Sequence, residues 1–105
     1  MNERIEKIKT FLAQNPNDLF LNHALALEYI KIGDDSQALS YFNQNKAYDP
    51  NYVATYYHLG KLLERIGNSV QALAVYEAGM RIAKEQKDQH AYNELQAAYE
   101  DLADY

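Results

Sequence analysis

The sequence repeats itself at an interval of 34 residues, and this periodicity constrains the fold more than any other feature. When residues 16–39 are aligned with residues 50–73, eight positions are identical, where about two would be expected from composition. The identical pairs are Pro16 and Pro50, Asn17 and Asn51, Leu25 and Leu59, Ile32 and Ile66, Gly33 and Gly67, Gln37 and Gln71, Ala38 and Ala72, and Leu39 and Leu73. The chain therefore contains two copies of one supersecondary unit.

Each copy is predicted to be two helices joined by a tight turn. Apolar residues recur at helical spacing on both sides of Gly33, and the same pattern surrounds Gly67. A glycine just past a helix takes up the left-handed backbone conformation that ends it. Asp34 and Asn68, which follow the glycines, supply side-chain acceptors for the free amides of the next helix. No segment shows the alternation of a strand, so the sequence predicts an all-α protein.

The two ends of the chain resemble incomplete units. Residues 3–14 carry an apolar stripe typical of the second helix of a repeat, formed by Ile5, Ile8, Phe11 and Leu12. The last segment begins at Asp88, which suits an N-cap, and continues with apolar residues at helical spacing, Tyr92, Leu95, Tyr99 and Leu102. We therefore expect a single domain over residues 1–105, with a helix at 3–14, repeats at 19–52 and 53–86, and a capping helix at 88–103.

The charge and composition exclude several classes of partner. Acids and bases balance through residue 87, so the formal net charge of −5 falls entirely on residues 88–105. An acidic chain is a poor ligand for nucleic acid, whose phosphates require a basic face. No apolar run approaches the roughly 20 residues of a membrane span, and the absence of cysteine suits a reducing compartment. We expect a cytoplasmic protein with no nucleic-acid and no membrane partner.

Together these residues resemble the tetratricopeptide repeat (TPR). With Leu19 and Val53 opening the units, the positions typical of the family are filled by Ala26 and Gly60 (eighth), Ala38 and Ala72 (twentieth), Phe42 and Tyr76 (twenty-fourth) and Pro50 (thirty-second). The small residues allow the two helices of a hairpin to approach closely. The sequence departs from the family at Asn22, Asn45 and Lys84. Because Lys84 replaces a proline, the last repeat helix is expected to continue to about Lys87. The resemblance implies a right-handed α-α superhelix of two full repeats plus capping helices.

The resemblance also implies a non-catalytic scaffold that binds a protein or peptide segment in a concave groove. The family's inner-face positions fall on Phe20, His23, Leu27, Ile30 and Lys31 in repeat 1, and on Ala54, Tyr57, Lys61, Glu64 and Arg65 in repeat 2. Repeat 1 thus offers an apolar surface and repeat 2 a charged, mostly basic one. Some members hold a C-terminal carboxylate with lysine and asparagine at the fifth and ninth positions of their first repeat. Here these are His23 and Leu27, so that clamp is not inherited.

No residue pattern points to catalysis, a metal or a cofactor. Ser36 and Ser69 stand at helix starts, where capping accounts for them. His23 and His58 have no second ligand at metal-binding spacing on the same helix, and there is no glycine-rich phosphate loop. We expect no enzymatic activity, no cofactor and no metal. Two alternatives stay open: a homodimer that buries Phe20, Leu27 and Ile30 against a second copy, and a small metal- or ligand-binding accessory protein built around His23 and His58.

Overall fold

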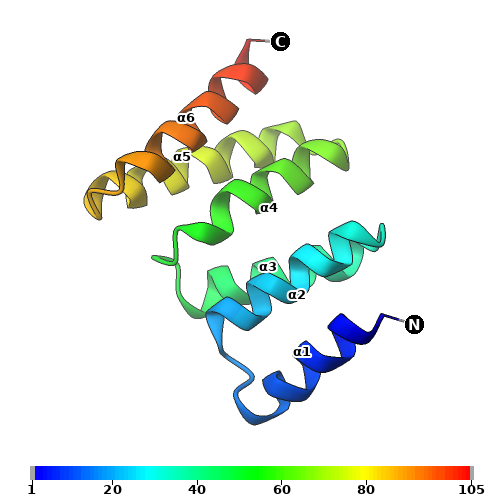
Figure 1. The fold of residues 1–105 in the computed structure, drawn as a ribbon. Helices are drawn as coiled ribbons and strands as arrows, with labels where there is room; N and C mark the ends of the chain where they lie inside the picture. Colours follow the sequence, from blue (N-terminus) through cyan, green and yellow to red (C-terminus); the bar gives the residue numbers. More distant parts are fainter. Residues whose placement is uncertain (1, 105) are drawn as a thin grey trace. The chain divides into compact units, whose positions relative to one another are not determined.

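The computed structural model describes residues 2–104, which form six α-helices and no strand (Figure 1). The helices are α1 (Glu3–Gln14), α2 (Leu19–Lys31), α3 (Asp35–Tyr48), α4 (Ala54–Arg65), α5 (Ser69–Glu85) and α6 (Gln89–Ala103). The all-α fold class of helical hairpins is confirmed, and each predicted helix is present. The chain divides into two compact units at Tyr52 and Val53, which is the predicted boundary between the repeats. That all of residues 1–105 act as a single domain stays a prediction.

The glycines in the two hairpin turns adopt the backbone conformation that the sequence predicted. Gly33 has φ +81° and Gly67 has φ +88°, so both occupy the left-handed region that a side chain would disfavour. The amide of the following residue then bonds back to the carbonyl five residues earlier, Asp34 to Tyr29 at 2.9 Å. This is the Schellman arrangement, and it satisfies carbonyls that the helix end leaves free. The Asp34 side chain in turn accepts from the amide of Gln37 and begins α3.

The turn between α5 and α6 has the same geometry without a glycine. The Asp88 amide donates to the Ala83 carbonyl at 2.9 Å, and Lys87, at φ +59°, takes the left-handed position. A non-glycine residue at such a position is strained by contact between its Cβ and the backbone. The helix ends at Glu85, two residues before the end expected from the sequence, because the turn takes up Gln86 and Lys87. Asp88 is the N-cap of α6, as predicted.

The core of the first unit lies along two faces of α2, one toward α3 and one toward α1. Leu25 and Ala26 are fully buried with Ala38 and Phe42 of α3. The small side chains allow the two helices to approach closely, as the sequence predicted. On its other side, α2 is covered by α1, which buries an apolar stripe of Ile5, Ile8 and Leu12.

Two asparagines support the first unit where the sequence departs from the repeat pattern. Asn22 is 1% exposed, and its amide donates to the carbonyls of Pro16 at 2.9 Å and Asp18 at 3.1 Å. Asn45 is also 1% exposed, and its amide donates to the Leu19 carbonyl at 2.8 Å. Each amide thus satisfies backbone carbonyls around the start of α2, and Asn45 links α3 to that helix.

The second unit packs α5 between α4 and α6 at two glycines. A Cβ built on Gly60 would lie 2.2 Å from Cε1 of Tyr76, and one on Gly79 would lie 2.7 Å from Cβ of Tyr56. Both distances are far below van der Waals contact. The ring of Tyr76 is fully buried, so it has no open space into which it could move. These glycines therefore set how closely the helices of this unit approach.

Candidate protein-binding faces

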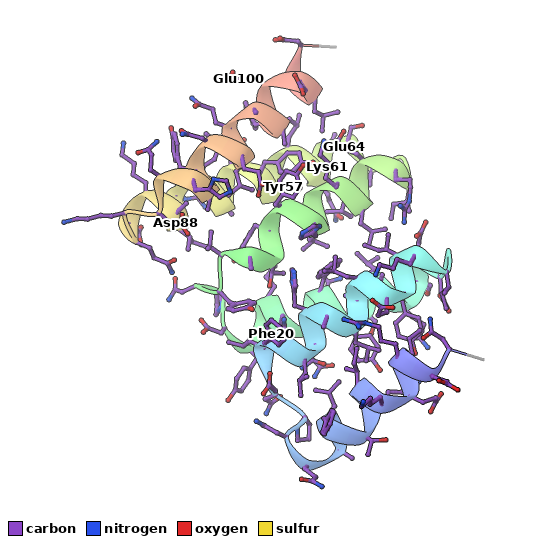
Figure 2. The ribbon with its side chains drawn as sticks, in the orientation of Figure 1. Phe20, Tyr57, Lys61, Glu64, Asp88 and Glu100 are labelled. Carbon is purple, nitrogen blue, oxygen red and sulfur yellow. The ribbon has the colours of Figure 1, made fainter. Side chains whose placement is uncertain are left out.

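The expected contact residues of the first unit lie along one side of α2. The stripe is opposite the side that α2 buries with Leu25 and Tyr29. Phe20 is 69% exposed, Leu27 and Ile30 are half-buried, and Lys31 is exposed at the C-terminal end of the helix. Figure 2 shows the Phe20 side chain at the start of α2. α2 therefore carries apolar residues on its buried face and also on the face that carries Phe20. Only the buried face is fully covered within the first unit.

His23 belongs to the same stripe but turns into the first unit. Its imidazole packs edge-on against the ring of Phe42, with the centroids 5.7 Å apart, and against the ring of Tyr52 at 6.3 Å. Burial and the nearby Asp18 carboxylate raise the pKa of Tyr52. His23 is half-buried, so it borders the apolar surface and leaves Phe20 as the more open contact.

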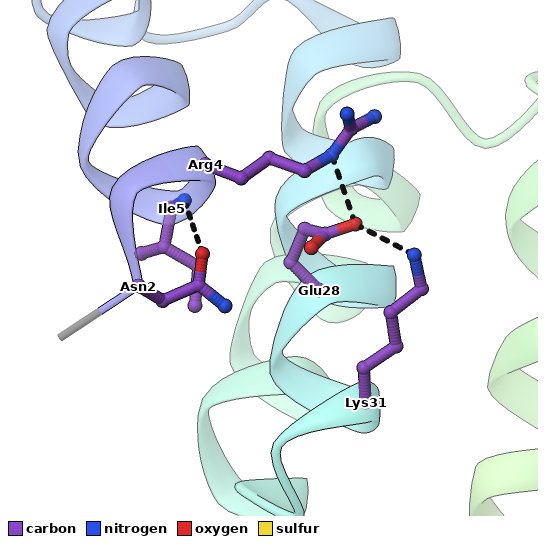
Figure 3. Close-up of polar contacts among 5 residues, drawn as sticks. All are labelled: Asn2, Arg4, Ile5, Glu28 and Lys31. Carbon is purple, nitrogen blue, oxygen red and sulfur yellow. Dashed lines mark hydrogen bonds and ion pairs between the residues drawn. The ribbon is translucent and has the colours of Figure 1, made fainter.

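A buried acid that sequence reasoning missed positions Lys31. The side chain of Glu28 is 8% exposed, and its Oε2 lies 3.0 Å from Nε of Arg4 and 3.1 Å from Nζ of Lys31 (Figure 3). Two bases compensate the cost of burying one carboxylate, and the Arg4 contact ties α1 to α2. The Lys31 side chain remains 69% exposed, so it can still meet a partner. Glu28 is the only acid in a mostly apolar helix, which could have marked it as unusual. The sequence could not show that its partner, Arg4, comes from α1.

The expected contact residues of the second unit follow one another along α4 (Figure 2). The Lys61 ammonium lies 5.8 Å from the centroid of the half-buried Tyr57 ring, within the range of a cation–π contact. It also lies 3.8 Å from Oε2 of Glu64, which accepts a hydrogen bond from the Tyr76 hydroxyl. Burial, and then the Glu64 carboxylate, raise the pKa of Tyr76 far above its ordinary value. Glu64 therefore balances part of the basic charge expected here, and Arg65 is exposed at the end of the helix.

His58 does not line this face openly. Its imidazole meets the Tyr57 ring edge-on with the centroids 5.3 Å apart. Burial lowers the pKa of His58, and the Glu94 carboxylate opposes that shift with a smaller effect. His58 and His23 lie in different units. Within residues 2–104, no three histidine, aspartate or glutamate side chains gather as metal ligands, and no helix there is long and apolar enough to cross a bilayer.

Several solved structures match this chain. The crystal structure of a tetratricopeptide repeat domain protein from Salinibacter ruber is 41% identical, over 82% of this chain and 96% of that one, with a TM-score of 0.79. The solution structure of a Bordetella parapertussis protein is 28% identical, over 98% of this chain and 90% of that one, with a TM-score of 0.83.

A curated protein agrees with these structures. A TPR repeat-containing protein of Pseudomonas aeruginosa is 28% identical over 91 residues, which are 87% of each chain. The sequence matches none of the established protein-family models. The repeat register, the paired helices and the similarity to solved TPR domains lead to one assignment: this chain belongs to the tetratricopeptide-repeat family.

Proposed function

We propose that the chain is a non-catalytic module that binds a protein segment on the open sides of α2 and α4. The TPR fold is in general a scaffold for protein–protein interaction, so a protein partner is the expectation for any member. The contact residues in this proposal are those named above, Phe20, His23, Leu27, Ile30 and Lys31 on α2 and Tyr57, Lys61, Glu64 and Arg65 on α4. We further propose a cytoplasmic location, in keeping with a sequence that has no cysteine.

The exposed side of α2 is the observation that carries this proposal. A surface helix normally presents one apolar side to the core and a polar side to water. α2 buries Leu25 in the core of its unit and yet presents Phe20, 69% exposed, on the face that neither α1 nor α3 covers. A large exposed apolar side chain, with half-buried Leu27 and Ile30 following it on the helix, is typical of a contact surface for another protein.

The chemistry of the two helices limits what such a segment can be. α2 suits an aliphatic or aromatic anchor, because its open surface is apolar up to Lys31. On α4, Tyr57 offers a ring edge with a polar tip, and Lys61 and Arg65 offer bases. An apolar anchor would complement α2, and an acidic residue would complement α4. Truncating Leu27 or Tyr57 to alanine should weaken binding by about 1–2 kcal/mol, whereas neutralising Lys61 or Arg65 should mainly slow association.

A capture experiment with a matched control tests the proposal. The parent chain, a Phe20→Ser/Leu27→Ser variant and a Val70→Ser variant are immobilised and exposed to lysate of the host. Val70 is 82% exposed on α5, so its replacement removes a comparable apolar side chain outside the proposed surface. We expect a protein that is retained by the parent and by Val70→Ser but lost from the double variant.

The captured protein then serves as the ligand in a chemical-shift titration. Shifts on α2 and α4 would support the proposal. Shifts confined to the outer helices, around Tyr41, Asn43, Val75 and Glu77, would refute it and place the working surface on α3 and α5.

Homodimerisation through α2 is the second candidate, since a second copy would also cover Phe20, Leu27 and Ile30. Light scattering over a range of concentrations distinguishes it. A dimer in which amide exchange at Leu27 and Ile30 slows would replace the first proposal.

A further inference from the structure

A hollow lies between α5 and α6 in the second unit. Its volume is about 400 Å³, and its lining residues are Ala83, Lys84, Lys87, Asp88, Gln89 and Tyr92. A second hollow of about 310 Å³ adjoins it, because Lys84 and Tyr92 line both, and adds Glu77, Met80 and Arg81. The side chains of Arg81, Lys84 and Lys87 form no hydrogen bond or ion pair with any residue that the structure describes. We refer to the two together as the α5–α6 hollow.

The repeat register identifies what fills the equivalent place in the first unit. At twice the 34-residue interval, Lys84 corresponds to Pro16. After a two-residue insertion before α6, Gln89 corresponds to Leu19 at the start of the preceding first helix. In the first unit both backbone carbonyls are reached by side chains of α3: Gln44 donates to the Pro16 carbonyl at 3.2 Å, and Asn45 donates to that of Leu19 at 2.8 Å. In the first unit, the second helix of the repeat, α3, therefore occupies this place. The α5–α6 hollow is the equivalent place in the second unit.

One side of the helix α1 is suited to pack into the α5–α6 hollow. It corresponds in register to α3 and α5, and it buries Ile5, Ile8 and Leu12 against the following helix α2. Its other side, which in α3 faces a preceding first helix, is open. Phe11 stands at the position of Asn45; Asn45 is 1% exposed, whereas Phe11 is 53% exposed. Lys7 stands at the position of Tyr41 and is also exposed.

The charges of the two surfaces also complement each other. Repeat helices pair antiparallel, so the start of α1 would lie along the end of α6. The open side of α1 carries Lys7 at that end, whereas residues 88–105 contain five acids and no lysine or arginine. The end of α1 has no base in its last turn to offset its free carbonyls, and it would meet Lys84 and Lys87 of the hollow.

We propose that α1 of one copy docks into the α5–α6 hollow of a second copy, with the Phe11 ring as its anchor. The contact completes a repeat between two chains, since α6 supplies the first helix and α1 of the other copy the second. It is a heterologous contact, so each copy keeps one free end and assembly continues with concentration. A contact of two helices is small, and we expect it to be weak and to weaken further with salt.

A complementation experiment tests this arrangement. Phe11→Ser removes the anchor, and Lys84→Glu/Lys87→Glu reverses the charge of the hollow. All three residues are exposed, so both variants should fold. We expect the parent chain to gain mass with concentration in sedimentation, and each variant alone to associate at least about tenfold more weakly.

A mixture of the two variants distinguishes the proposed contact between α1 and the α5–α6 hollow from a contact elsewhere on the chain. Each variant keeps the end that the other has lost, so the mixture should form a 1:1 heterodimer and nothing larger. A parent chain that stays monomeric at millimolar concentration would overturn the proposal. A parent dimer that both variants form equally well would also overturn it, because that contact would be elsewhere.

Disulfide trapping gives a second, independent readout, since the chain has no cysteine of its own. Phe11→Cys and Gln89→Cys in separate chains correspond to Asn45 and Leu19, which are in contact in the first unit, so oxidation should join them quickly. Val70→Cys, at an exposed position outside the contact, is the control partner for Gln89→Cys. Equal rates of crosslinking with the control would refute the docking. So would a chain carrying both Phe11→Cys and Gln89→Cys that crosslinks only within itself.

Discussion

Replacing Gly60 by alanine is the sharpest test of how α4 and α5 pack. The added Cβ would lie 2.2 Å from Cε1 of Tyr76 and 2.7 Å from its Cδ1 and Cζ. The ring cannot move aside cheaply, because it is fully buried and its hydroxyl donates to Glu64. The substitution therefore forces the two helices apart or tilts the ring away from its carboxylate partner.

The expected magnitude comes from opposing effects. Alanine is favoured over glycine inside a helix by about 1 kcal/mol, which would stabilise the variant. Overpacking costs about 1–3 kcal/mol, and weakening the hydrogen bond from Tyr76 to a charged acceptor costs up to about 1.5–3 kcal/mol more. The steric effect should win, so we expect Gly60→Ala to lower the free energy of unfolding by about 2 kcal/mol and Tm by about 8 °C.

Denaturant unfolding of the single and double variants measures this directly. In a Tyr76→Leu background the ring is absent, so Gly60→Ala should instead raise the free energy of unfolding by about 1 kcal/mol through helix propensity alone. The two effects of the same substitution then differ by about 3 kcal/mol, a coupling that reports direct contact. A Gly60→Ala variant as stable as its parent, or equal effects in the two backgrounds, would refute the close approach.

Three further predictions concern single positions. Lys87→Gly should raise the free energy of unfolding by about 0.5–1 kcal/mol, because glycine adopts φ +59° without strain. Thr55→Val should raise it by about 1 kcal/mol, because the fully buried Thr55 hydroxyl has no hydrogen-bond partner among the described residues. Burial lowers the pKa of His58 in the folded state, so stability should be complete above about pH 6.5 and fall as pH drops below it, where only the unfolded chain readily binds the proton.

Two of these predictions have a control in the same chain. Thr10→Val should change stability by less than about 0.5 kcal/mol, because Thr10 is exposed and its hydroxyl bonds within its own helix. The pH dependence should flatten in His58→Gln and persist in His90→Gln, since His90 is exposed. A destabilised Lys87→Gly, a destabilised Thr55→Val, or a pH profile unaffected by His58→Gln would each contradict its own argument.

The hairpins could be predicted because their determinants are local. Helical spacing of apolar residues, the glycines at positions 33 and 67, and the caps Asp34 and Asp88 each act over a few residues of chain. The helix at residues 3–14 and the helix that follows Asp88 were predicted from the same signals, and both helices are present. The early end of α5 was not predicted, because nothing in the local sequence marks Lys87 as a residue that adopts a left-handed conformation.

The candidate site was predicted only as a set of helix positions. The sequence assigned Phe20 and Lys61 to their helix sides, and helical spacing places Lys61 beside Tyr57 and Glu64, but it could not fix the rotamers that bring these groups into contact. Nor could it show that Glu64 accepts the Tyr76 hydroxyl and so offsets part of the basic charge. Such contacts depend on rotamers and on which neighbouring helix reaches the same point.

The sequence by itself determined the repeat, the helices and the helix ends that glycines or caps mark, since a 34-residue periodicity and local caps act through the chain's own neighbouring residues. Only the tertiary structure decided how the atypical residues are used. Asn22 and Asn45 serve as hydrogen-bond donors to carbonyls at the start of α2, and Glu28 is a buried acid shared by Arg4 and Lys31. These roles depend on residues up to 26 positions apart in sequence, and folding alone brings them within hydrogen-bonding distance.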